Sequence, residues 1–435
     1  MSEGEVRILR ADRRQLQWDL VDLEGLLAVD HRARLVWAFV ERLDLRPFYD
    51  GIKAREGVAG RPAADPAVLV ALWLYATLEG VGSARELERL CRGEVAYRWL
   101  CGGVPVNYHG LSDFRVGHEE LLDRLLSESV ATLMAEGLVS LDEVMIDGTK
   151  VKASAGKGSF LGEKALARAE RFAGERIRRL KGELDSDPGA GVRRRQAAQE
   201  RAARELKDRA SRALAALERL KAEKAERAKS HGKAEAKKGE PKASLSDPEA
   251  RFMRFADGAR RPAYNMQIAA TREGLVVALK ESDRRNDAGL AGLMVDDIHR
   301  RYGQGPKAIL VDTRYATAED IVALAGRKQG PVLVYSPLPD DRQDVKPETL
   351  KRRTATRRKE HHALEEWRRR MTSPAAAPVY KARRRIELVN AHFKNRGFGS
   401  LTLRGGLKAR LVGLWHALAH NILVADRLRT LPAPC

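Results

Sequence analysis

One long segment, residues 155–245, differs in composition from everything around it. It is rich in Ala, Arg, Lys and Glu, and it contains Asp187-Pro188-Gly189, a sequence typical of a tight turn. Within residues 206–220 apolar side chains recur at helical spacing, as in a helical hairpin or a short coiled coil. We therefore predict two long helices inserted into another fold, followed by a mobile Lys-, Gly- and Glu-rich stretch at about 228–243.

With residues 155–255 set aside, strand and helix patterns alternate along the rest of the chain. Strands are expected at 143–153, 264–270, 275–280, 308–312 and 331–336, and helices at 288–302, 318–326 and, after a basic stretch at 341–370, at 380–394. The order strand, strand, strand, helix, strand, helix, strand, helix predicts an α/β domain with a mixed sheet. It resembles the order of a ribonuclease-H-like core.

Residues 1–140 have a helical pattern almost throughout. Asp65 followed by Pro66 predicts the start of a helix over 67–79, and a capping box at Ser83 predicts the start of the next. Further helices are expected at 94–100 and from Ser112 towards Ala135. The spacing resembles a helix-turn-helix arrangement, with Arg85, Arg89, Arg98 and Arg115 available to DNA, but an ordinary helical bundle fits it equally well.

These patterns together predict an α+β or α/β protein in three parts. A helical N-terminal domain would span residues 1–140, and the ribonuclease-H-like core would span 141–154 and 256–430. The charged helical hairpin at 155–255 would interrupt that core.

The charge balance favours a polyanionic partner. The chain has 80 Lys and Arg residues against 60 Asp and Glu, a formal net charge of +20. The longest apolar run, residues 67–78, is too short to span a bilayer, and the first residues lack a signal-peptide pattern. Three cysteines without a CxxC pair suit a reducing cytoplasm. Nucleic acid is therefore the expected partner, with no membrane role.

Residues 380–394 carry the most informative pattern in the chain. On one continuous helix Tyr380, Arg383, Glu387 and Lys394 would fall within about 60° of one another, an arrangement that would bind phosphates beside a metal-binding acid. The alternative is a solvated face on which Glu387 pairs with Arg383. The opposite side of this helix is apolar, with Ala382, Ile386, Val389 and Phe393.

Two further acids stand where apolar strands are expected to end. Asp147 follows Val-Met-Ile and Asp312 follows Ile-Leu-Val, so both could meet Glu387 at one sheet edge. Carboxylates so placed suit Mg²⁺, and two ions about 3.5–4 Å apart support phosphoryl transfer. For any single Asp, a turn or a helix cap is the alternative. The rival second acids Asp283, Asp287, Asp296 and Asp297 end no apolar strand.

Taken together, the motifs resemble those of DDE-type bacterial insertion-sequence transposases. Tyr380, Arg383, Glu387 and Lys394 match the Tyr-x₂-Arg-x₃-Glu-x₆-Lys signature of that family at every spacing. Other blocks with a counterpart in the family are Ile146-Asp147-Gly-Thr, Leu310-Val-Asp312, Pro262-Ala-Tyr-Asn-Met-Gln and Asn107-Tyr-His-Gly-Leu-Ser-Asp-Phe-Arg. The resemblance covers nearly the whole chain.

The resemblance implies cleavage and joining of DNA at terminal inverted repeats. Asp147, Asp312 and Glu387 would hold two Mg²⁺ or Mn²⁺ ions, while Tyr380, Arg383 and Lys394 would hold phosphates around the cut. The expected partners are element ends and target DNA, bound by a homodimer at the nucleoid. One departure concerns Arg314, which stands two residues after Asp312 where the family commonly has a small residue.

Other interpretations concern non-catalytic roles. A repurposed transposase could retain DNA binding without catalysis, or the 155–245 hairpin could bind nucleic acid non-specifically on a helical scaffold. His416 and His420 have the i, i+4 spacing of zinc peptidases, but Ala417 stands where the general-base Glu would be, so packing is expected. His361 and His362 lie in a basic run without a metal pattern. Nothing in the sequence chooses between DNA and a second protomer as the partner of the hairpin.

Overall fold

The computed structural model describes residues 22–52, 54, 62–186, 190–231, 239–313, 315–338 and 361–430. Several expectations fall outside these residues. They are the Asp187-Pro188-Gly189 turn, residues 232–238 of the stretch expected to be mobile, most of the basic stretch at 341–370, and the effect of Arg314 on its turn.

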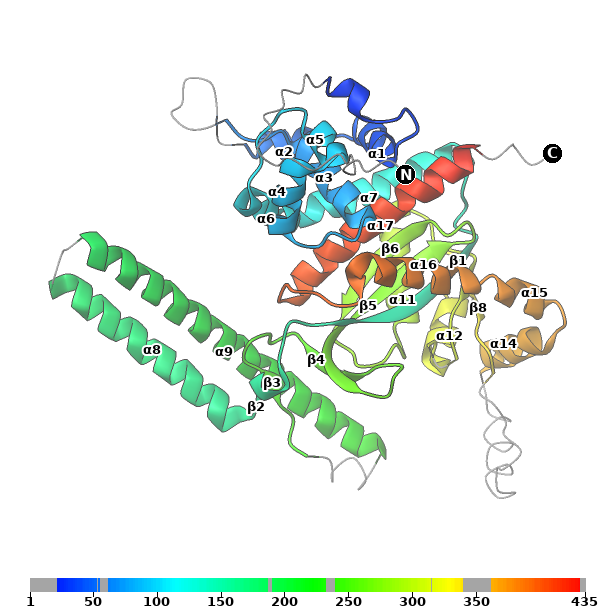
Figure 1. The fold of residues 1–435 in the computed structure, drawn as a ribbon. Coiled ribbons are helices and arrows are strands. Elements are labelled where there is room, and N and C mark those ends of the chain that lie inside the picture. The colour runs from blue at the N-terminus through cyan, green and yellow to red at the C-terminus, as the bar shows by residue number, and fades with distance from the viewer. Residues whose placement is uncertain are drawn as a thin grey trace, which may run out of the picture.

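The part of the chain that the structure describes contains a six-stranded mixed sheet (Figure 1). β5 runs antiparallel to β1 on one side and to β6 and β4 on the other, while β7 and β8 continue parallel to β1. The order from edge to edge is therefore β6-β5-β1-β7-β8, with β4 beside β5. The strands are β1 (Glu143–Lys152), β4 (Arg251–Arg254), β5 (Arg260–Thr271), β6 (Val276–Ser282), β7 (Ala308–Leu310) and β8 (Leu333–Tyr335).

β1 is longer than its apolar sequence alone indicates. We expected Asp147 at the end of this strand, but β1 pairs with β5 from Val144 to Lys152, so Asp147 lies in its middle. The reason is that β5 supplies ladder partners well beyond the apolar run, and hydrogen bonding to a neighbour continues a strand through polar residues. The position of Asp147 was therefore predicted wrongly, although the strand itself is confirmed.

The helical N-terminal region is confirmed. Asp65 caps α3 by accepting a hydrogen bond from the Ala67 amide, and Ser83 caps α4 through the Glu86 amide. The region begins with a 3₁₀ turn at Glu24–Leu26 and contains α1 (Arg32–Val40), α2 (Arg46–Asp50), α3 (Pro66–Leu78), α4 (Ala84–Gly93), α5 (Val95–Cys101), α6 (Tyr108–Gly117) and α7 (Glu119–Ala135).

The single helix expected from Ser112 towards Ala135 is two helices. α6 already begins after Asn107, whose side chain accepts a hydrogen bond from the Gly110 amide. It ends at Gly117, where His118 takes a non-helical conformation, and α7 follows. A side-chain cap upstream of Ser112 and the non-helical backbone of His118 decide these boundaries.

The C-terminal helix joins the helical region to the sheet. α17 contacts β5 and β6 as well as α3, α6 and α7, and Figure 1 shows it running between the blue helices and the sheet. One continuous apolar core extends from α1 through α17 to the sheet. The remaining helices of this part are α11 (Ala291–Tyr302), α12 (Ala318–Ala325), α14 (His362–Thr372), α15 (Ala376–Lys381), α16 (Arg384–Phe393) and α17 (Gly406–Thr430).

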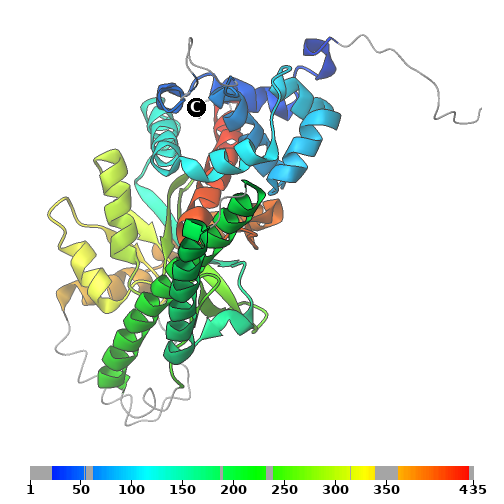
Figure 2. The same ribbon diagram turned by 90° about the vertical axis from the view of Figure 1, so that its left-hand side faces the viewer.

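The charged segment forms the expected pair of helices. α8 (Glu163–Ser186) and α9 (Ala190–His231) lie side by side and project from the sheet (Figures 1 and 2). A separate small core holds their base, where Leu166 packs with Ala213, Ala216 and Leu217. Two short strands, β2 (Phe160–Leu161) and β3 (Ala243–Ser244), pair where the segment leaves and rejoins the fold.

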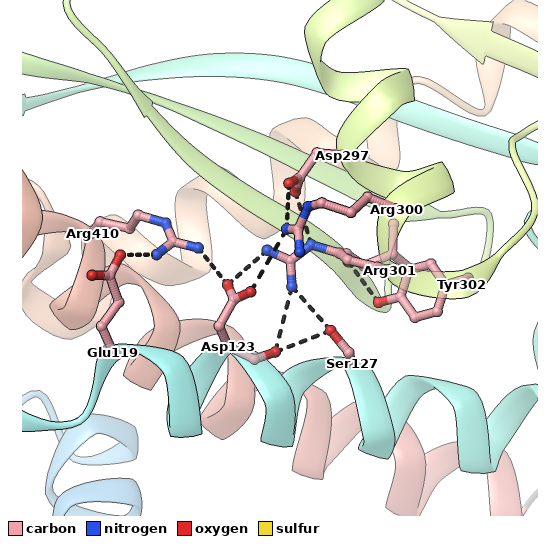
Figure 3. Close-up of polar contacts among 9 residues, drawn as sticks. Glu119, Asp123, Ser127, Asp297, Arg300, Arg301, Tyr302 and Arg410 are labelled. Carbon is pink, nitrogen blue, oxygen red and sulfur yellow. Dashed lines mark hydrogen bonds and ion pairs between the residues drawn. The ribbon is translucent and has the colours of Figure 1, made fainter.

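A second link between the helical region and the sheet domain is ionic (Figure 3). Arg301 of α11, with a side chain only 1% exposed, donates to Asp297 and to Asp123 of α7 at 2.8 and 2.7 Å. Arg410 of α17 pairs with Glu119 and Asp123. Three elements far apart in sequence are thereby held together by charge as well as by apolar contact.

The described helices include none that is long and apolar enough to cross a membrane. The helical region followed by a mixed sheet agrees with the expected mixture of α and β structure. The division into three domains stays a prediction.

Candidate active site

Asp147 is the centre of a polar cluster between β1 and α16. Its carboxylate accepts hydrogen bonds from Arg383 Nη2 at 3.2 Å and from Asn390 Nδ2 at 2.9 Å. Both partners come from the segment that follows residue 380, more than 230 positions away in sequence. The fold thus brings the first expected acid against the expected acidic helix.

The environment of Asp147 disfavours its negative charge. Burial raises the pKa of this carboxyl to about 6, Arg383 opposes the shift, and Asp287 and Asp312 reinforce it. Only 20% of the side chain is exposed. Asp147 is therefore largely shielded from water. Two nearby carboxylates, Asp287 and Asp312, act against its charge, and the guanidinium of Arg383 acts in its favour.

Arg383 connects Asp147 to Glu387. Its Nη1 donates to Glu387 Oε1 at 2.7 Å while its Nη2 donates to Asp147, and its Nε has no partner among the described residues. The guanidinium is largely buried, whereas Glu387 is 59% exposed. The ion pair between Arg383 and Glu387, which the sequence offered as an alternative, is present. The same guanidinium also pairs with Asp147 of β1.

The expected continuous helix over 380–394 is interrupted. α15 ends at Lys381 and α16 begins at Arg384. Between them the amides of Ala382 and Arg383 bond three residues back, to Val379 and Tyr380, so the chain tightens for one turn. The expectation of a single helix was wrong in this respect, because the local turn changes the angle between Tyr380 and Glu387.

The apolar side of this segment packs as expected. Ile386, Val389 and Phe393 are each at most 2% exposed. The ring of Phe393 makes an edge-to-face contact with Phe398 of the following turn, and it also lies beside the ring of His416 of α17. This packing fixes α16 on the sheet, so that its opposite side presents Arg383 and Glu387.

Asp312 lies next to the same cluster, two residues beyond β7. Its Oδ1 accepts a hydrogen bond from the Thr313 amide at 2.8 Å, and its side chain is exposed. Tyr380 donates its hydroxyl to the carbonyl of Val311 at 3.2 Å, which ties the end of α15 to the residue before Asp312. Burial raises the pKa of Tyr380.

Asp287 reaches the centre of the sheet from a loop, although it ends no strand. Its Oδ1 accepts hydrogen bonds from Asn265 and Gln267 of β5, each at 2.8 Å. A Cβ atom at Gly148 would lie 2.1 Å from this oxygen, so only glycine permits the approach. Since successive side chains of a strand point to opposite faces, Asp287 meets β1 on the face away from Asp147.

Sequence patterns missed Asn390 as a partner of Asp147, and they missed Asn265 and Gln267 as partners of Asp287 on the other face of the sheet. Asn390 is 6% exposed and follows Glu387 by three residues, so a polar residue on the buried side of α16 was a usable signal. Asn265 and Gln267 are fully or almost fully buried at alternate positions of an apolar strand. Buried amides of this kind require partners, and Asp287 is one.

Three further expected residues lie outside this cluster. Lys394 is exposed at the end of α16, and Arg98 is half-buried on α5. Arg115 is buried: its guanidinium lies 4.6 Å from the centre of the Trp73 ring, and its Nη1 donates to the carbonyl of Gly82. A contact between these side chains and DNA stays a prediction.

The two C-terminal histidines are core residues. His416 and His420 are 5% exposed, and burial lowers their pKa values to about 3 and about 4. His420 Nε2 lies 3.0 Å from the carbonyl of Gly274. The expectation that they serve packing is confirmed for both, and His361 caps α14 through the Ala363 amide.

The site suits a divalent cation in ligand type and charge. Its oxygens are hard carboxylate donors, and Asp287 and Asp312 raise the pKa of Asp147 as an uncompensated negative charge would. Within the described ranges, however, no three His, Cys, Asp or Glu side chains are grouped closely enough to hold an ion. Arg383 stands between Asp147 and Glu387 in this arrangement.

Comparison with known families gives two matches. Residues 21–116 match the Transposase domain (DUF772) family, and residues 228–422 match the Transposase DDE domain family. Asp312 and Glu387 lie inside the second match, while Asp147 lies between the two. No curated protein matches the chain, and no solved structure does.

Proposed function

Because the chain belongs to the DDE-type insertion-sequence transposases, we propose that it binds the ends of its own element in double-stranded DNA, cuts them and joins them to target DNA. The observation that carries the proposal is the link from Asp147 through Arg383 to Glu387. It joins the central strand to the signature helix beside Asp312. The active complex is proposed to be a homodimer.

The strand order supports a ribonuclease-H-like core for this enzyme. β1, β5 and β6 are the first, second and third long strands of the sheet, and β7 and β8 extend it parallel to β1. The order is thus 3-2-1-4-5, with the second strand antiparallel to its neighbours. This arrangement puts the central strand and the end of β7 side by side, which is where Asp147 and Asp312 lie.

Asp147, Asp312 and Glu387 are the residues that would hold Mg²⁺ or Mn²⁺. When bound, two such ions would activate the attacking oxygen and stabilise the leaving one. Asp147 must be ionised to serve as a ligand, and a pKa of about 6 leaves it mostly ionised at neutral pH. A cation beside it would also relieve the repulsion by Asp287 and Asp312.

Arg383 is proposed to exchange partners when DNA enters. Its unpaired Nε and its planar fork suit a phosphodiester oxygen pair. Movement of the guanidinium towards phosphate would free Asp147 and Glu387 for the cation. The tightened turn between α15 and α16 is the place where such a shift can be absorbed, and Tyr380 and Lys394 are proposed to hold neighbouring phosphates.

The test is cleavage of an element-end duplex by Asp147→Asn, Asp312→Asn and Glu387→Gln proteins in Mn²⁺ or Mg²⁺. Each substitution should reduce cleavage at least about a thousandfold, because metal ions supply several kcal/mol of transition-state stabilisation. Binding of the same duplex without divalent ions should be retained. Asp283→Asn, which removes an exposed acid elsewhere, is the matched control and should cut normally.

A wild-type protein that binds element ends but never cuts them, with or without Mn²⁺, would instead support a repurposed DNA-binding protein. Retained cleavage in Asp147→Asn would overturn the assignment of the three acids.

A further inference from the structure

A pocket of about 260 Å³ lies between the helical N-terminal region and the turn that follows α16. One wall is the turn after α3 and the start of α4, and the other is the turn Lys394–Phe398 with the residues after it. The two walls lie close together at Gly397 and Gly80. A Cβ atom added at Gly397 would be in van der Waals contact with the carbonyl oxygen of Gly80, at 3.7 Å. Its polar lining side chains are Thr77, Ser83, Arg115, Arg396, Ser400, Thr402 and His416.

Arg115 brings a buried positive charge to this pocket. The residue is 9% exposed, stacks on Trp73 and uses Nη1 on the Gly82 carbonyl, while its Nε has no hydrogen-bond partner among the described residues. Burial lowers the pKa of Arg115 to about 10, so the guanidinium stays charged at neutral pH. A buried charge without an opposite charge is costly, which makes an anion a stabilising ligand here.

Arg396 adds a second positive charge from the catalytic side. It is half-buried, and burial lowers its pKa. The acid that acts on it, Glu79, does not line the pocket and forms an ion pair with Arg32 at 2.9 Å. The lining therefore holds two guanidinium groups and no carboxylate.

The hydroxyl groups complete the chemistry of an anion site. Ser83, Ser400 and Thr402 line the pocket beside the two guanidinium groups, and hydroxyls donate readily to phosphate oxygens. His416 is buried, and burial lowers its pKa to about 3, so at neutral pH it adds no charge to the lining. At about 260 Å³ the pocket is smaller than those that enclose drug-sized ligands, which suits a single small group.

We propose that the Arg115–Arg396 pocket binds a phosphate group, and that in the working protein this is a backbone phosphodiester of the element end. The second part rests on the proposed function. Because Arg396 follows Lys394 by two residues, a phosphate held here would fix DNA against the end of the helix that carries Glu387. It would also hold the helical region and the catalytic core on the same DNA strand.

The experiment compares the full-length protein with Arg396→Gln and Arg396→Lys, without divalent ions. Inorganic phosphate should raise the melting temperature of the wild type and of Arg396→Lys, and raise that of Arg396→Gln much less. The salt dependence of binding to an element-end duplex should have a slope smaller by about one in Arg396→Gln, as expected when one phosphate contact is lost. Lys408→Gln, which removes one exposed charge of α17, controls for net charge.

Each outcome decides the proposal. Equal thermal protection of all variants by phosphate would overturn the proposal that this pocket binds phosphate. An equal decrease in the salt-dependence slope of DNA binding in Lys408→Gln and Arg396→Gln would overturn it too. If thermal protection by phosphate depends on Arg396 but the salt-dependence slope of DNA binding is unchanged, the ligand is a free phosphate. The assignment to a DNA phosphodiester would then be overturned. Because no step requires cleavage, failure of the proposed transposase chemistry would leave these results unaffected. Thr402→Val, which keeps both charges, should weaken protection by phosphate and provides a second variant.

Discussion

Two clusters of arginine and carboxylate differ in their balance of charge. The interface cluster, which joins α7, α11 and α17, contains Glu119, Asp123, Asp297, Arg300, Arg301 and Arg410. Its three acids meet three guanidinium groups. At the site around Asp147, one guanidinium serves both Asp147 and Glu387, while Asp287 and Asp312 add further negative charge.

The pKa values report the same difference. Burial raises the pKa of Asp297, but Arg301 and Arg300 outweigh it and the net shift is downward. Burial raises the pKa of Asp147 to about 6, and Arg383 does not compensate for it. The interface cluster thus has a cationic partner for each of its acids, whereas a cation beside Asp147 would relieve the excess negative charge there. The comparison distinguishes a charge cluster in which each acid has a cationic partner from one with an excess of negative charge, which is the arrangement expected of a ligand site.

The largest expected effect comes from breaking the interface cluster. Arg301→Met should lower the free energy of unfolding by about 3–5 kcal/mol, because it leaves Asp297 and Asp123 buried without their shared partner. Urea denaturation measures the loss. Arg300→Gln is the control: its side chain is 61% exposed, so it should cost less than about 1 kcal/mol. Equal losses in both would show that the burial of Arg301 is not what matters.

Neutralising one acid in each cluster should change stability in opposite directions. Asp297→Asn should lower the free energy of unfolding at pH 7.5 by about 2 kcal/mol, since two guanidinium groups lose their charged partner. Asp147→Asn should raise it by about 1–2 kcal/mol, because it removes a charge that the folded state disfavours. A destabilised Asp147→Asn protein would mean that Arg383 already balances this site.

The dependence on pH sharpens this test. Between pH 3.8 and about 6 the folded state holds a proton on Asp147 that the unfolded chain has lost, so wild-type stability falls as pH rises through this window. The advantage of Asp147→Asn should therefore appear above pH 4 and level off above 6. For Asp297 the pKa is lowered, so its contribution is complete above pH 3.8 and is lost on further acidification. Denaturation curves from about pH 2 to pH 8 check both trends.

The smallest effect concerns the shared guanidinium. Arg383→Gln should reduce the slope of log affinity for element-end DNA against log salt by about one, since one phosphate contact is removed. Arg300→Gln removes an equal charge from the interface cluster and should leave this slope unchanged. An unchanged slope in Arg383→Gln would confine Arg383 to holding Asp147 and Glu387.

Much of the element order followed from local patterns. The helical hairpin, the strands β5 to β8 and the caps at Asp65 and Ser83 follow from periodicity and from side chains close in sequence. The three acids and the signature spacing were also visible in the sequence. These features depend on neighbours within a few residues, which a sequence contains in full.

Other features depended on partners far along the chain. Asp147 lies in mid-strand because β5 pairs with β1 beyond its apolar residues. Asn390 belongs to the site because α16 packs across β1, and Arg115 is buried because Trp73 and Gly82 surround it. No periodicity encodes such contacts.

The sequence by itself determined which residues are candidates for the chemistry: three acids, the spacing of charged residues over 380–394 and a large positive charge. Only the tertiary structure decided how those charges are shared, with Arg383 between Asp147 and Glu387 and Arg301 between Asp123 and Asp297. The physical reason is that an ion pair depends on distance and burial, and folding sets both between residues more than 150 positions apart.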